Sequence, residues 1–177
     1  MKGKNQPRKK SAARVTHRAP PVCELCAHDG GEVLWRDAAC RVVLVADPDY
    51  PGYCRVIWNA HVREMTDLAG AGQQHFMRVV CALEQALRTA VKPHKINLAS
   101  FGNLTPHLHW HVIPRFEDDP HFPHSIWGER QRAGRKRAFS GVAARLRALL
   151  VKSLGNPTKA FEPPMNADER RKIKSVP

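Results

Sequence analysis

The sequence predicts an α+β fold, in which a five-stranded, mainly antiparallel sheet carries one long helix and a C-terminal helix follows. Short β-branched segments succeed one another with turns between them, which is typical of antiparallel strands. Residues 73–91 repeat apolar side chains at helical spacing. Residues 107–113 alternate strictly between histidine and large apolar residues, as expected of a strand with two different faces.

Five segments meet the criteria for strands. The first two are separated by a short Asp-Ala-Ala turn, and a loop rich in proline and glycine at 47–52 precedes the third. A tight connection at 102–106 joins the last two. The predicted strands are residues 33–36, 40–46, 53–59, 95–101 and 107–113.

Two segments are predicted as helices. In the longer one, residues 73–91, apolar side chains recur at i, i+3, i+4 and i+7, so that one face is buried, and Pro93 ends it. The second helix spans residues 140–154, with Ser140 as the expected N-cap and Gly155 just beyond its end.

The 177 residues suit one domain with extensions at both ends. The expected divisions are a basic, disordered tail (1–20), a central domain (21–128) and a basic C-terminal extension with one helix and a tail (129–177). Seven basic and no acidic residues lie in 1–18, and thirteen basic and four acidic residues lie in 129–177, so the net charge of +13 resides in the two ends. Such ends attract polyanions, including nucleic acid, without sequence specificity.

Five cysteines without a secretory signal argue against a disulfide framework and favour a cytoplasmic location. The longest apolar runs are too short to span a bilayer, so no membrane association is expected. Cys40, Cys54 and Cys81 lie in apolar sequence surroundings and are predicted to be small core residues.

The segment from His107 to Arg115 carries the main functional signal. On a strand, His107, His109 and His111 share one face at intervals of about 6.6 Å, while Leu108 and its apolar counterparts occupy the other. Imidazole acts as a nucleophile, a proton carrier or a metal ligand near neutral pH. Three in a row on an anchored strand therefore indicate a working site.

This run resembles the signature of the histidine triad (HIT) family, and the order of motifs around it is also similar. The resemblance covers roughly residues 22–128. It includes Cys23-x-x-Cys26, Pro51-Gly52-Tyr53, a strand ending at His61, Asn103 and Pro114-Arg115. The later Asp118–Gly128 stretch looks like a bacterial branch of dinucleoside-polyphosphate hydrolases. The family resemblance implies the same HIT-like sheet and a homodimer.

The resemblance also implies an activity: hydrolysis or transfer at a phosphoanhydride, as in diadenosine tetraphosphate, or at a phosphoramidate. His109 would be the nucleophile that forms a nucleotidyl-histidine, between His107 and His111 as the other triad members. His111 would hydrogen-bond a phosphate oxygen or the bridging oxygen, and Asn103 would hold the α-phosphate and orient water. Asn97 and Asp47 would add nucleotide contacts. No catalytic cofactor is needed.

A structural zinc is the expected metal. Cys23 and Cys26 form a two-thiolate knuckle, and relatives with a zinc at matching positions imply His61 and His107 as the remaining ligands. A closed Cys₂His₂ site has no open position for catalysis. The alternative is a pair of buried thiols with His61 capping a helix.

Several positions leave alternatives open. Tyr53 stands where many members have a further histidine, and a phenol is no base near pH 7. Asn103 stands where glutamine is more common and is also a typical turn residue after Gly102. Arg115 could meet phosphate or cap its strand, and the loop holding Trp127 is assigned no role. The competing functions are a nucleic-acid-associated protein that uses its basic ends and a nucleotide-binding regulatory module with weak catalysis.

Overall fold

The computed structural model describes residues 23–156; the tail predicted at 1–20 and the end of the C-terminal extension lie outside this range. It confirms the predicted fold class. Five strands form one sheet in the order β1-β2-β3-β5-β4, and every neighbouring pair is antiparallel. The strands are β1 (Glu32–Arg36), β2 (Cys40–Leu44), β3 (Cys54–Trp58), β4 (Lys95–Ala99) and β5 (His109–Arg115).

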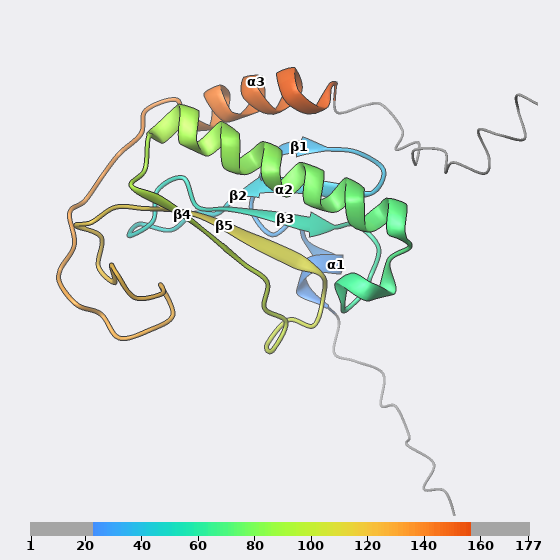
Figure 1. Cartoon of the computed structure of the whole chain (residues 1–177), viewed down its shortest axis with the longest axis horizontal. Coiled ribbons are helices and arrows are strands. Elements are labelled where there is room, and N and C mark those ends of the chain that lie inside the picture. Colours follow the sequence, from blue (N-terminus) through green and yellow to red (C-terminus); the bar gives the residue numbers. More distant parts are fainter. Residues whose placement is uncertain (1–22, 157–177) are drawn as a thin grey trace, which may run out of the picture.

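Two helices cover one face of the sheet (Figure 1). The long helix α2 (Gly70–Val91) packs across β3 and β5, and α3 (Val142–Leu154) packs beside α2 and against β1. Their fully buried side chains, such as Phe76 and Leu146, meet the apolar row of the central strands in one core. Within residues 23–156, no helix combines the length and hydropathy needed to cross a membrane.

The face of the sheet opposite α2 carries the polar side chains of the central strands. Because side chains alternate along a strand, burying Val56 and Val112 against α2 directs Arg55 and His111 to the other side. The short helix α1 (Glu24–Ala27) covers only part of this face, where Leu25 packs on Val43 and Ile57. At the other end of this face, Tyr53 and Ile113 are buried under Tyr50 and Ile126 from the neighbouring loops. Part of the face, around His109 and His111, remains open as a cavity.

Some boundaries differ from the sequence predictions. β5 begins at His109, because the N–H groups of His107 and Leu108 bond to Thr105 and Val62 outside the ladder. The long helix starts at Gly70, three residues early. The last helix is capped by Gly141, in the left-handed region at φ 66°, rather than by Ser140.

The prediction for the cysteines was right at two positions and wrong at one. Cys40 and Cys54 are fully buried, whereas Cys81 is exposed. Cys81 lies on α2, whose helical period turns this position away from the core although its sequence neighbours are apolar.

Candidate active site and metal centre

A cavity of about 440 Å³ opens on the face of the sheet opposite α2. Its size falls in the range of small-molecule sites in proteins. β5 contributes two imidazoles, whose ring centroids are 4.7 Å apart, and β3 contributes one guanidinium. The loop before β5, the loop after it and the short helix α1 supply the remaining walls. The lining side chains include Arg55, Phe101, Asn103, His109, His111 and Trp127.

His109 is fixed in one tautomer. Its Nδ1 lies 2.6 Å from the carbonyl oxygen of His107, which can only accept a hydrogen bond, so Nδ1 carries the proton. Nε2 is then left with a free lone pair. Burial lowers the pKa of His109, which keeps the ring neutral near pH 7. The ring therefore meets the requirements of a nitrogen nucleophile.

His111 is fixed in the reverse sense by a short hydrogen-bonded chain. Arg55 Nε donates to the phenol oxygen of Tyr53 over 3.3 Å, which leaves the phenol proton for His111 Nδ1 at 2.5 Å. A neutral ring that accepts at Nδ1 carries its proton on Nε2. Burial, then the neighbouring His109, lower the pKa of His111 to about 3. His111 is therefore a neutral N–H donor beside the lone pair of His109.

His107 is directed away from these two rings and does not line their cavity. Its Nε2 donates to the carbonyl oxygen of Trp58 at 2.7 Å, so Nδ1 is unprotonated. That nitrogen lies 3.4 Å from the sulfur of Cys23 and 3.5 Å from that of Cys26. The three histidines that the sequence placed in one row are thus divided between two sites.

The ligand atoms of Cys23, Cys26, His61 and His107 all lie within 4.8 Å of one another. Cys26 Sγ is 3.3 Å from His61 Nδ1. Tetrahedral Zn²⁺ bonds of about 2.3 Å to sulfur and 2.0 Å to nitrogen place such atoms about 3.5 Å apart. The side chains present therefore fit a zinc ion, and the Trp58 carbonyl would orient His107 as a second partner.

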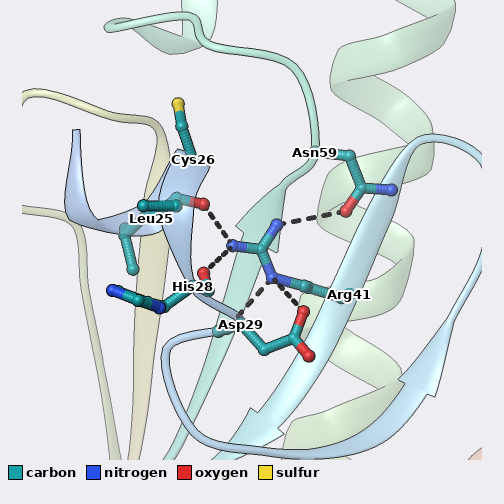
Figure 2. Close-up of a pocket in the computed structure, with 7 residues that line it drawn as sticks. Leu25, Cys26, His28, Asp29, Arg41 and Asn59 are labelled. Carbon is teal, nitrogen blue, oxygen red and sulfur yellow. Dashed lines mark hydrogen bonds and ion pairs between the residues drawn. The ribbon is translucent and has the colours of Figure 1, made fainter. Parts of the chain in front are cut away.

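Arg41 holds the knuckle in place from β2 (Figure 2). Its buried guanidinium donates to the carbonyl oxygens of Leu25, His28 and Asp29 at 2.6, 3.3 and 3.0 Å. It also donates to Asn59 Oδ1 at 3.2 Å. One side chain thus ties the segment that carries the two cysteines to the end of β3, two residues before His61. These bonds position the segment that carries two of the four candidate ligands beside the segment that leads to a third.

Of the remaining predicted site residues, one lines the cavity and two do not. Asn103 lines the cavity, on an exposed part of the loop before β5. Asn97 does not line it, and its side-chain oxygen accepts a hydrogen bond from Arg115 at 2.5 Å. Asp47 lies in the loop before β3, where its carboxylate accepts the backbone N–H groups of Asp49 and Tyr50. It does not line this cavity either.

Arg115 is fully engaged in structure. It is 1% exposed and pairs with Asp119, 2% exposed, over 2.6 and 2.9 Å. It also donates to the carbonyl oxygen of His124, which fixes the loop that leads to Trp127. Of the two roles left open for Arg115, the structure supports the structural one.

Sequence reasoning missed Arg55 and the aromatic wall. Arg55 faces His111 in the antiparallel register, and strand alternation in 53–59 places it on the face of Tyr53. The alternation could be predicted from the sequence, but the pairing of Arg55 with His111 could not. Phe101 and Trp127, each 49% exposed, contact each other with ring centroids 4.7 Å apart and flank His111. Their contact joins two loops that are distant in sequence.

Known proteins are similar to this chain in sequence and in fold. Residues 29–118 match the HIT domain. The AP-4-A phosphorylase of Mycobacterium tuberculosis is 28% identical over 120 residues, 63% of this chain and 62% of that protein. The chain therefore spans less than two thirds of this relative's length.

Solved structures agree. A histidine triad protein from Marinobacter aquaeolei VT8 is 26% identical, with a TM-score of 0.61 over 75% of this chain and 97% of the other. A zinc-bound histidine triad family protein from Mycobacterium smegmatis shares the fold, at 22% identity, with a TM-score of 0.53 over 74% and 94%. Since the family match covers half of the sequence, the chain belongs to the HIT domain family.

Proposed function

We propose that this protein is a nucleotide hydrolase or transferase that cleaves a phosphorus anhydride through a covalent nucleotidyl-histidine on His109. The observation that carries the proposal is the pair of fixed tautomers. The carbonyl of His107 leaves a lone pair on His109, and the Tyr53 phenol leaves a proton on His111. The relative named AP-4-A phosphorylase supports a dinucleoside polyphosphate as substrate.

In the first step, Nε2 of His109 attacks the α-phosphorus, and the bond from phosphorus to the bridging oxygen breaks. The electron pair leaves with that oxygen, towards which Nε2–H of His111 donates. In the second step, water or inorganic phosphate attacks the same phosphorus, and the bond to His109 breaks. Water releases a proton to solvent and yields a nucleoside monophosphate, and phosphate yields a nucleoside diphosphate. Asn103 would hold an α-phosphate oxygen during both steps.

Zinc is proposed as a structural ion held by Cys23, Cys26, His61 and His107. The fit of the donor atoms and the zinc-bound relative from Mycobacterium smegmatis support this. Four protein ligands leave no open position on the ion, so its part would be to fix the strand that carries His109. The homodimer implied by the family resemblance stays a prediction.

The test is His109→Ala, assayed with diadenosine tetraphosphate with and without inorganic phosphate. We expect turnover to fall by about 10³-fold or more, since the covalent route is lost, while nucleotide binding persists. Alkaline quenching of the wild type should trap a nucleotide adduct that the variant lacks. His94→Ala, at a half-exposed histidine that does not line the cavity, is the matched control. Near-normal turnover by His109→Ala would refute the proposal.

A further inference from the structure

Arg55 places a guanidinium inside the cavity, on the side of His111. In the register of β3 and β5, Arg55 lies opposite His111, whereas the apolar Ile57 lies opposite His109. The charge is therefore displaced along the sheet from the attacking nitrogen, towards the ring that would donate to the bridging oxygen. A group bound by Arg55 would lie beyond the scissile bond, on the leaving side.

The guanidinium is only partly used by the protein. Its Nε donates to the Tyr53 phenol at 3.3 Å, and its carbon lies 5.6 Å from the centre of that ring. In the part of the chain from 23 to 156, no group accepts from Nη1 or Nη2 and no carboxylate forms an ion pair with Arg55. Glu24 lines the same cavity but is exposed and unpaired with Arg55. Two donor nitrogens, Nη1 and Nη2, with four N–H groups between them thus remain for a ligand.

The chemistry of this group selects its partner. A planar guanidinium matches two oxygens of a phosphate at once, and such bonds strengthen where water is partly excluded. Arg55 is half-buried, and its stem is held by the bond from Nε to Tyr53. The remaining fork is therefore pre-organised for an oxyanion rather than for a neutral amine.

We propose that Arg55 binds the phosphate of the leaving group, so that the site selects nucleoside polyphosphates over nucleoside phosphoramidates. This rests on the proposed function, since it assumes that His109 attacks the α-phosphorus. When the bond to the α-phosphorus breaks, the polyphosphate group leaves as an anion that Arg55 stabilises. The nitrogen of a phosphoramidate takes up a proton from solvent and leaves as a neutral amine, which gains nothing from Arg55. The sequence was compatible with both substrate classes, and we expect Arg55 to distinguish between them.

The experiment compares kcat/KM for diadenosine tetraphosphate and adenosine 5′-phosphoramidate in the wild type and in Arg55→Met. We expect a loss of about 10- to 100-fold with the first substrate beyond any loss with the second, the range for a charged hydrogen-bonding group. Arg55→Lys keeps the charge and should restore part of the preference. Arg55→Gln is a second neutral variant should Arg55→Met fold poorly by circular dichroism.

Tyr53→Phe is the matched control, because it breaks the chain to His111 and leaves the Arg55 charge. It should lower turnover of both substrates, and it should change the ratio of the two kcat/KM values less than Arg55→Met does, because the Arg55 charge remains. If Arg55→Met lowers turnover of both substrates equally, Arg55 acts only through Tyr53 and the proposal is overturned.

Binding separates this proposal from the proposed function. Isothermal titration with ADP and AMP measures the added phosphate without turnover. In the wild type ADP should bind more tightly than AMP, and Arg55→Met should reduce that ratio about tenfold. A wild type that cleaves neither substrate would contradict the proposed function. If Arg55→Met leaves the ratio of ADP affinity to AMP affinity unchanged, Arg55 does not bind the added phosphate and the present proposal is contradicted.

Discussion

The phenol oxygen of Tyr53 lies 2.5 Å from Nδ1 of His111, and Arg55 donates to the same oxygen from the other side. A residue that departs from the common family pattern is thus joined directly to the triad. Because Arg55 donates to the phenol oxygen, the phenol proton points to Nδ1 of His111. Burial raises the pKa of Tyr53, which keeps that proton in place.

Replacing Tyr53 with phenylalanine should slow turnover by about tenfold with little change in KM. The ring shape is kept, but His111 loses the donor that fixes its tautomer, which is worth about 1 kcal/mol. Steady-state kinetics measures this effect. Tyr53→His, which supplies an imidazole donor, should recover part of kcat. A wild-type kcat in Tyr53→Phe would show that His111 does not depend on the phenol.

His111 should make stability fall as the solution becomes more acidic. Its folded pKa of about 3 lies below the ordinary 6.5, so between these values the unfolded chain binds a proton that the folded chain rejects. Stability contributed by the neutral ring is present above pH 6.5 and is lost as pH falls towards 3. In His111→Gln the slope of unfolding free energy against pH should be smaller by up to about 1.4 kcal/mol per unit. Urea titrations between pH 4.5 and 6.5 measure it, and equal slopes would contradict it.

Metal analysis should find about one zinc per chain, and Cys26→Ser should remove most of it. Loss of one thiolate opens the tetrahedral site, and the melting temperature should fall because metal binding contributes to folding free energy. Cys81→Ser, at an exposed cysteine on α2, should keep the metal. A wild type purified without chelator and free of zinc, which also fails to take it up, would exclude the ion.

Arg41→Met should weaken zinc binding by about 10- to 100-fold although Arg41 is no ligand. The carbonyls of Leu25, His28 and Asp29 lose their shared donor, so the knuckle is no longer held in advance. The free energy of unfolding should fall by about 2 kcal/mol or more. Arg36→Met breaks a solvent-exposed ion pair with Asp29 and should change stability by less than about 1 kcal/mol. Competition with a chromophoric chelator measures the zinc affinity. Equal zinc affinities in Arg41→Met and Arg36→Met would show that Arg41 does not position the two cysteines.

Asp119→Asn should destabilise the fold by about 3–5 kcal/mol, since it leaves the buried Arg115 guanidinium without its counter-charge. Asp119 also accepts the backbone N–H groups of Phe116, His121 and Phe122, so the loop that leads to Trp127 should loosen. Chemical denaturation measures the first effect and Trp127 fluorescence the second. Glu117→Gln, at an exposed neighbour, should be close to neutral. A stable Asp119→Asn protein would mean that solvent reaches Arg115.

The sequence by itself determined the elements and the chemistry-bearing residue types. Strict alternation in 107–113 separates imidazoles from apolar side chains, because a strand has a period of two. The helical period in 73–91 fixed the packing face of α2 for the same kind of local reason. The Cys23-x-x-Cys26 knuckle is also local, and the structure brings His61 and His107 to it as the family resemblance implied.

Only the tertiary structure decided which of these residues line the cavity, which lie at the candidate zinc site and which make structural contacts. His107 leaves the row of the triad because its backbone bonds outside the β5 ladder and its ring bonds to Trp58, which no local pattern encodes. Arg55 reaches His111 through the register between strands separated by more than fifty residues, and Asn97 is drawn to Arg115 by the pairing of β4 with β5. Periodicity assigns a face within one strand, but the neighbour across that face depends on how distant segments pack.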